Sequence, residues 1–232
     1  MRSYFSLGLL LAVGLSSGGY FIGKGIADRN SGSRSISVKG LAEREVPATL
    51  AIWSIGYQSS GNDLVGLNEK LKADTQAVID FLTTKHGFAA TDIAVQPPSF
   101  TDTSLQMRDK DTPPPALRYN GFQSVLLRTA MVDAIKGTMA DMSDLIQKQV
   151  MLSTRSAPRF SFDELNKIKP AMIQEATKNA RTAAEQFSKD SQTKLGKLRN
   201  ASQGWFQVDD RDEATPEQKV VRVIVEVEYE VE

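Results

Sequence analysis

Cysteine is absent from this chain of 232 residues, and histidine occurs only once. The lack of cysteine excludes disulfides, thiolate nucleophiles, iron–sulfur clusters and the usual structural zinc sites. The single histidine, His86, excludes zinc sites built from several histidines of one chain. It precedes Gly87 at the end of an apolar-periodic segment, which is typical of a helix C-terminus. We therefore interpret His86 as a structural residue.

The chain also has no excess of charge of either sign. Lysine and arginine total 28, and so do aspartate and glutamate. Without a positive field there is little attraction to a phosphate backbone, so we predict no nucleic-acid partner. Hydrophobic residues make up 41% and charged residues 24%, as in ordinary globular domains. The bulk of the chain is therefore expected to fold.

The common catalytic motifs are missing as well. We find no phosphate-binding Gly-x-x-x-x-Gly-Lys-Ser/Thr, no Gly-x-Ser-x-Gly and no His-Glu-x-x-His. Carboxylates gather in two segments, without the ligand spacing of a calcium loop: Asp102, Asp109 and Asp111, and then Asp209, Asp210, Asp212 and Glu213. We interpret the first group as exposed residues of the proline-rich loop and the second as a solvated turn. The sequence predicts no catalytic, cofactor-binding or metal-binding residues, and no enzyme.

The amino terminus contains an uncharged segment from Tyr4 to Ile22. Its roughly 19 residues match the length of a membrane-spanning helix. We predict a membrane anchor over residues 1–27, with a cleaved signal peptide as the alternative, and a polar linker over residues 28–35. Counting charges around the segment would place the domain in the cytoplasm. The short basic tip instead favours export, with the domain in the periplasm.

Residues 36–232 are expected to form one domain that begins with two strands and a long helix. Ile36–Gly40 and Ala48–Tyr57 have the composition of strands, and 43–47 is predicted as a bulge or turn. Apolar residues at helical spacing run from Leu64 to the Lys85-His-Gly segment. Strands are then predicted at 93–96 and 119–131, separated by a proline-rich loop or hairpin tip over Pro97–Arg118.

The second half repeats this mixture of helices and strands. A helix is predicted near 132–145, extended chain at 150–162 and a long helix at 163–189, whose buried stripe is Ile173, Ala176, Ala180, Ala183 and Phe187. A strand at 195–208 leads through an acidic turn to a last strand over 221–231, which alternates valine with charged residues. We predict an α+β fold, an antiparallel or mixed sheet with long helices on one face, preceded by one transmembrane helix.

Four aromatic residues lie in apolar strand segments. They are Trp53, Tyr57, Trp205 and Phe206. Aromatic side chains in such positions bury large apolar areas. We predict that they belong to the core or to an interface.

Several segments resemble the SIMPL-domain family of bacterial envelope proteins. They are Ile36-Ser-Val-Lys-Gly40, Val46-Pro-Ala48, Lys85-His-Gly-Phe88 leading to Asp92-Ile93, and the alanine-rich 176–187 segment leading to Leu195-Gly-Lys-Leu198. The chain departs from the family pattern at Asp190-Ser191 and in its proline-rich loop. The resemblance implies an exported or membrane-anchored protein, a tendency to form homo-oligomers, and an association with envelope or oxidative stress. It brings no catalytic residues.

Two functional hypotheses follow. The first is a non-enzymatic protein of the bacterial inner membrane, single-pass and facing the periplasm, that assembles into a homo-oligomer through strand edges. The second is an adapter that binds a ligand or a protein partner through the Pro97–Arg118 loop. The sequence identifies neither the partner nor the subunit number.

Overall fold

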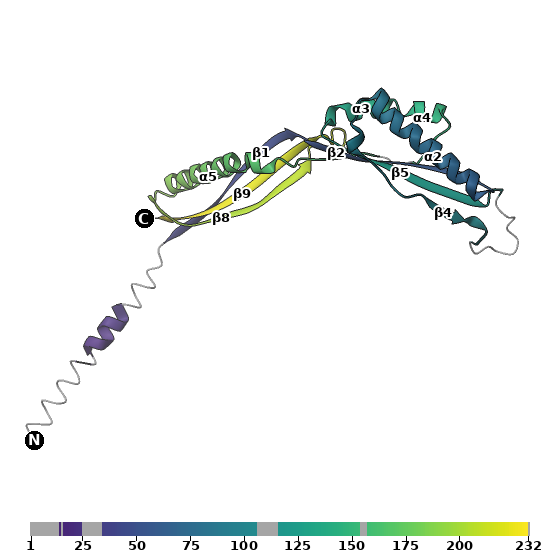
Figure 1. The fold of residues 1–232 in the computed structure, drawn as a ribbon. Helices are drawn as coiled ribbons and strands as arrows, with labels where there is room; N and C mark the ends of the chain where they lie inside the picture. The colour runs from purple at the N-terminus through teal and green to yellow at the C-terminus, as the bar shows by residue number, and fades with distance from the viewer. Residues whose placement is uncertain (1–13, 15, 25–33, 106–115, 154–156, 232) are drawn as a thin grey trace, which may run out of the picture. The chain divides into compact units, whose positions relative to one another are not determined.

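The computed structural model describes residues 14, 16–24, 34–105, 116–153 and 157–231 (Figure 1). Within them the chain divides into two compact units, each of which is described by itself. The terminal unit comprises Met1–Ala42, Ile173–Trp205 and Val223–Glu232. The central unit comprises Glu43–Met172 and Phe206–Arg222.

The sheet of the terminal unit has three strands in the order β1-β9-β8: β1 (Ser35–Pro47), β9 (Gln218–Val231) and β8 (Leu195–Asp210). The strands are antiparallel. At the end of β9 the amide of Val231 donates to the carbonyl of Arg34, just before β1, at 2.8 Å. The end of β8 and the start of β9 are joined by the amide of Arg211, which donates to the carbonyl of Gln218 at 2.9 Å. The predicted alternation of β9 is confirmed. From Val221 to Tyr229 the odd-numbered residues are buried, whereas Arg222, Ile224 and Glu226 on the other face are exposed.

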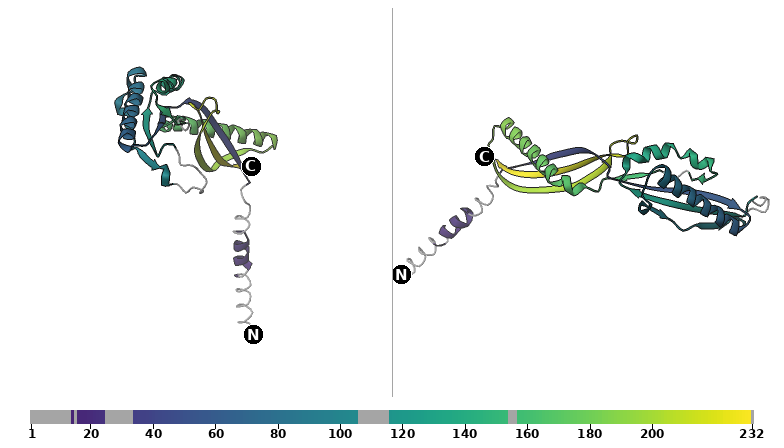
Figure 2. Two further views of the ribbon diagram at one scale, coloured as in Figure 1. Left: turned by 90° about the vertical axis from the view of Figure 1, so that its right-hand side faces the viewer. Right: turned by 45° about the horizontal axis from the view of Figure 1, so that its top comes forward.

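Helix α5 (Leu165–Asp190) runs along this sheet in both views of Figure 2. The long helix was predicted, and Pro170 lies within it. Its buried stripe was predicted only in part. The buried residues are Met172, Ala176, Ala180, Ala184 and Ser188, whereas Phe187 is 60% exposed. From Ala176 to Ser188 the buried side chains are small and recur every four residues, which lets the helix backbone approach the sheet closely.

The sheet of the central unit is built on the long antiparallel pair β2 (Leu50–Gly61) and β5 (Tyr119–Thr129). Short strands extend it on both sides, all of them antiparallel: β3 (Ile93–Val95), β4 (Ser99–Asp102), β6 (Met151–Leu152) and β7 (Arg159–Ser161). The core contains Trp53, Tyr57, Leu71 and Leu127, each with no exposed surface. The prediction of buried Trp53 and Tyr57 is therefore confirmed.

Helix α2 (Leu64–Asp80) covers β2 and β5 and begins at Asp63, whose carboxylate accepts from the amides of Val65 and Gly66. It continues as a π-helical turn, η1 (Phe81–Lys85), and ends as predicted at Gly87, with φ of 73°. His86 lies edge-on against Phe81, at 4.6 Å between ring centroids. Burial lowers the pKa of His86, so this helix end holds a neutral imidazole more readily than the charged one that a helix dipole would favour.

The remaining helices of the central unit are short. They are η2 (Ala90–Asp92), η3 (Thr103–Leu105), α3 (Val132–Ala140) and α4 (Ser143–Gln147). The single helix predicted near 132–145 is thus two helices, because the chain turns at Asp141 and Met142. The two still bury Ile135 and Leu145 in the same core, as their spacing predicts.

Of the predictions about connecting segments, one was wrong and one was right only in part. Residues 43–47 are not a turn, because β1 continues to Pro47 and its charged side chains form ion pairs with neighbouring segments, including Arg222 with Glu43 at 2.5 Å. The segment Pro97–Arg118, predicted as a loop or a hairpin tip, contains a strand of a hairpin, since β4 pairs antiparallel with Tyr119–Phe122 of β5. Pro97 and Pro98, which cannot donate backbone hydrogen bonds, separate β3 from β4. Pro113–Pro115 lie outside the described residues.

The predicted anchor is described only at residues 14 and 16–24, which are helical. Within the described part of the chain, no helix is both long enough and apolar enough to cross a membrane. Residues 1–13, which contain most of the predicted span, lie outside that part.

Candidate functional site

The aspartates of the two predicted clusters differ in what they contact. Asp210 pairs with Lys219, a side chain that is 7% exposed. Asp212 and Asp102 organise turns, whereas Asp109 and Asp111 lie outside the described residues. Among the described residues, no three His, Asp or Glu side chains gather as metal ligands.

Asp212 holds the turn between β8 and β9 in a fixed conformation. Its carboxylate accepts from the amides of Ala214 and Thr215, at 2.9 and 2.7 Å, and from the Thr215 hydroxyl. Arg211 donates to the same carboxylate at 3.0 Å. The Thr215 hydroxyl, followed by Arg211, lowers the pKa of Asp212 to about 2. The predicted solvated turn is therefore an ordered, hydrogen-bonded one.

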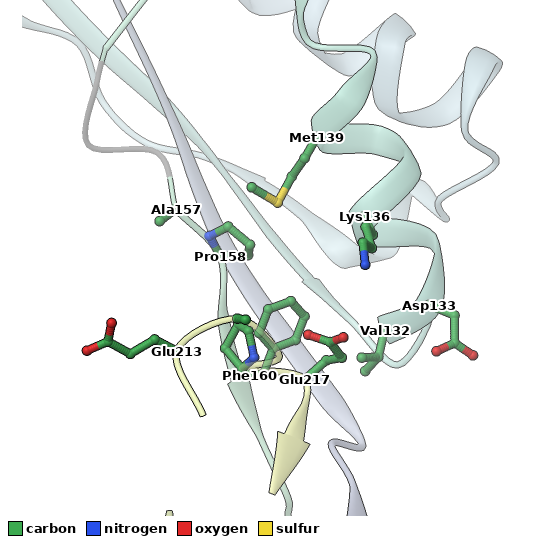
Figure 3. A pocket seen from close by; sticks show the side chains of 11 residues that line it. Val132, Asp133, Lys136, Met139, Ala157, Pro158, Phe160, Glu213 and Glu217 are labelled. Carbon is green, nitrogen blue, oxygen red and sulfur yellow. The ribbon is translucent and has the colours of Figure 1, made fainter. Parts of the chain in front are cut away.

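This turn forms one wall of a cavity of about 380 Å³ within the central unit (Figure 3). Helix α3 and the segment around β7 form the others. The apolar lining side chains are Val132, Met139, Ala157, Pro158, Phe160, Ala214 and Pro216, and the charged ones are Asp133, Lys136, Glu213 and Glu217. The volume lies at the lower end of the range of small-molecule pockets, which is about 300–1,000 Å³.

The sequence analysis missed this cavity. Its lining comes from three segments that are far apart in the chain, and no motif marks them. On α3 the lining residues Val132, Lys136 and Met139 follow helical spacing, but a surface residue and a lining residue look alike in such a pattern. Only Glu213 belongs to a group that the sequence analysis had considered.

The base of the proline-rich loop is tightly held in the central unit. Arg118 donates to one oxygen of Asp102 through Nε and a terminal nitrogen, at 3.0 and 2.9 Å. Arg118 and Ser104 together lower the pKa of Asp102 to about 2. The amide of Thr103 donates to the carbonyl of Arg118 at 2.8 Å, and Asn62 accepts from the Arg118 amide. The two ends of the loop are thereby held together.

Buried polar residues of the central unit serve the packing of α2. The Tyr57 hydroxyl contacts Thr75 Oγ1 at 2.5 Å, and Thr75 also reaches Gln123 at 3.0 Å. Asp74 is 2% exposed and pairs with Lys70, which donates to the carbonyl of Gln149. These contacts join α2 to the sheet and to the turn before β6. They serve the packing of the central unit, which favours a structural role.

Strand β8 is the least covered strand of the terminal unit. Among the described residues it pairs only with β9, on one side, and residues 197–205 are exposed on both faces. Trp205, predicted to lie in a core or an interface, is 95% exposed, so the prediction of a core position was wrong. The physical reason is that β8 lies at the sheet edge, where an apolar strand residue has no covering layer. Leu198 and, on β9, Ile224 are also exposed, at 55% and 48%.

The charged residues of β8 lie near its two ends. Lys197 and Arg199 lie near its start, and the next charged residues along the strand are Asp209 and Asp210. Charged side chains on a sheet edge oppose pairing with another strand. The segment Asn200–Val208 has no such protection, although it contains Trp205 and Phe206.

A comparison with known families gives a match over most of the chain. A family model described as SIMPL, a protein of unknown function (DUF541), matches residues 36–229. The chain belongs to the SIMPL family. The match covers both compact units, so the SIMPL domain includes the exposed β8 strand as well as the cavity of the central unit. No curated protein matches the chain significantly.

Proposed function

We propose that this SIMPL protein is a non-enzymatic, membrane-anchored envelope protein that assembles into a homo-oligomer through the outer edge of β8. The observation that carries the proposal is the charge-free Asn200–Val208 segment, exposed from Asn200 to Trp205, on a strand with one neighbour in the described part of the chain. An unpaired edge offers backbone donors and acceptors to another strand. In the proposal, β8 of a second copy takes this place.

The anchoring part rests on the uncharged Tyr4–Ile22 segment, which has the composition of a bilayer-spanning helix. Its short basic tip supports a single pass with the domain in the periplasm. A cleaved signal, which would leave a free periplasmic domain, is the second choice. The family's association with envelope or oxidative stress supplies the physiological setting of the proposal.

The assembly proposal is tested by measuring the mass of the full chain in detergent by light scattering. We expect a defined oligomer for the wild type. Replacing Ser202 and Trp205 with lysine should yield monomers, because copies paired through β8 would bring like charges together at the edge.

The matched control carries Thr177→Lys and Thr182→Lys, two lysines on exposed positions of α5. It should keep the mass of the wild type. A monomeric wild type, or a β8 variant that assembles while folded by circular dichroism, would sink the proposal.

A second candidate function is partner binding by the proline-rich loop. The paired ends of the loop, joined by Asp102 and Arg118, present it from a rigid base. Replacing residues 106–115 with a short Gly-Ser linker should abolish cross-linking to a partner in membranes and leave the mass unchanged. Loss of assembly in this variant would instead make the loop part of the oligomer interface.

A further inference from the structure

The cavity of the central unit is prepared for a ligand with an apolar body. Val132 and Met139 of α3 face it from one side, and Pro158 and Phe160 face it from another. Its third wall is the turn between β8 and β9. Asp212 holds this turn by accepting hydrogen bonds from two backbone amides and one hydroxyl. A flexible methionine beside an aromatic ring and two prolines adapts to compact apolar groups.

Carboxylates outnumber ammonium groups in the lining of the cavity. Three carboxylates line it, those of Asp133, Glu213 and Glu217, against the single ammonium of Lys136. In Figure 3 the carboxylate of Glu217 points towards the same part of the cavity as the Phe160 ring, whereas those of Asp133 and Glu213 point away. Within the described part of the chain, no ion pair involves Glu217 or Lys136.

An aromatic ring with a carboxylate nearby is a combination that recognises organic cations. The face of the ring attracts a cation through its quadrupole, and the carboxylate adds a full opposite charge. We propose that the cavity lined by Phe160, Glu217 and Met139 binds a small organic ammonium ion that carries an apolar group. Glu217 and Phe160 hold the cationic centre, the apolar group packs against Val132 and Met139, and Lys136 limits the affinity by repulsion.

The test uses two probes of similar size and opposite charge, benzyltrimethylammonium and phenylmethanesulfonate. Each is titrated into the full chain in a nonionic detergent, with the methionine methyl groups labelled for NMR. The Met139 methyl is assigned from the spectrum of Met139→Leu. We expect benzyltrimethylammonium to shift this methyl saturably, with a Kd on the order of 1 mM. The Met151 methyl, which lies outside the cavity lining, should not move.

Three substitutions separate the roles of the lining residues. Glu217→Gln should weaken binding of the cation about threefold or more, and Lys136→Gln should strengthen it by a similar factor. Phe160→Leu, which keeps an apolar side chain, should also weaken it. Glu213→Gln is the matched control, since it removes a carboxylate that points away from the cavity, and it should leave the Kd within about twofold.

Several outcomes would overturn the proposal. The first two concern the probes: the sulfonate shifts the Met139 methyl as strongly as the ammonium does, or neither probe gives a saturable shift. The other two concern the variants: Lys136→Gln no longer binds the ammonium, or Glu217→Gln and Glu213→Gln change its Kd equally. Retained oligomer mass in these variants would show that the cavity acts independently of the proposed assembly through β8.

Discussion

Gly40 of β1 lies beneath α5 at a point where no side chain fits. A Cβ atom there would lie 1.9 Å from the carbonyl oxygen of Ala176 and 2.5 Å from the amide nitrogen of Ala180. Both are backbone atoms of α5, so relief would require the helix to move. The glycine and the alanine stripe thus determine how closely the helix packs on the sheet.

We predict that Gly40→Ala lowers the free energy of unfolding by about 3 kcal/mol, a typical cost of overpacking. Gly137→Ala is the control, because a Cβ added at Gly137 meets nothing within 4 Å. Because alanine is a better helix former than glycine, Gly137→Ala should stabilise α3 by about 0.5–1 kcal/mol. Urea unfolding of the two variants measures both changes. Equal stability of Gly40→Ala and wild type would contradict the observed packing.

Asp212 provides a pH prediction at the residue scale. Its pKa is lowered to about 2, first by the Thr215 hydroxyl. A carboxyl whose pKa is depressed in the folded state stabilises that state above its ordinary pKa of 3.8, and this contribution is lost as the pH falls towards 2. We therefore expect the β8–β9 turn to loosen between these pH values.

The measurement is a pH titration of the carboxyl carbon of Asp212 by NMR. Thr215→Val should raise its midpoint towards 3.8, because the first cause of the shift is removed. Asp102, also at about 2 but held by Arg118 and Ser104, is the internal control and should titrate unchanged. An Asp212 midpoint that does not respond to Thr215→Val would refute the assignment.

At the element scale, α2 is stabilised by the row of residues that it buries against β2 and β5. Leu71 has no exposed surface, while Leu64 at the start of the same helix is 43% exposed. We expect Leu71→Ala to cost about 3 kcal/mol, from lost burial and the cavity that remains. Leu64→Ala should cost about 0.5 kcal/mol. Chemical unfolding distinguishes them, and similar losses would mean that α2 is not packed as described.

The elements show which sequence patterns were informative. The period-two alternation of β9 and the helical spacing ending at Gly87 both predicted the observed structure, because each pattern has a long, uninterrupted apolar face. The break between α3 and α4 was missed, since both helices bury residues on one continuous stripe. Strand β4 was missed because proline-rich neighbours resemble a loop, although pairing with β5 does not require the prolines to donate.

At the scale of the whole molecule, the proposed anchor makes a prediction about membrane association. The full chain should remain with the membrane fraction after an alkaline wash. Replacing Leu10 and Leu11 with arginine should release it, since each arginine at the centre of a spanning helix costs about 2.5–3.5 kcal/mol on insertion scales.

The control for this experiment replaces the same two leucines with isoleucine, which keeps the segment apolar. It should stay with the membranes. A wild-type chain that washes off would exclude a retained anchor and favour the cleaved-signal alternative.

The sequence by itself determined the α+β class, the family resemblance and most elements, because these depend on local periodicity, capping residues and turn chemistry. Only the tertiary structure decided which candidate residues lie together. It placed Glu217 and Phe160 on one cavity, joined Asp102 to Arg118, and left Trp205 exposed on an edge strand. The reason is that burial and proximity depend on how distant segments pack. A valine in β9 and a tryptophan in β8 both suit a strand, and only their position in the sheet determines which of them is covered.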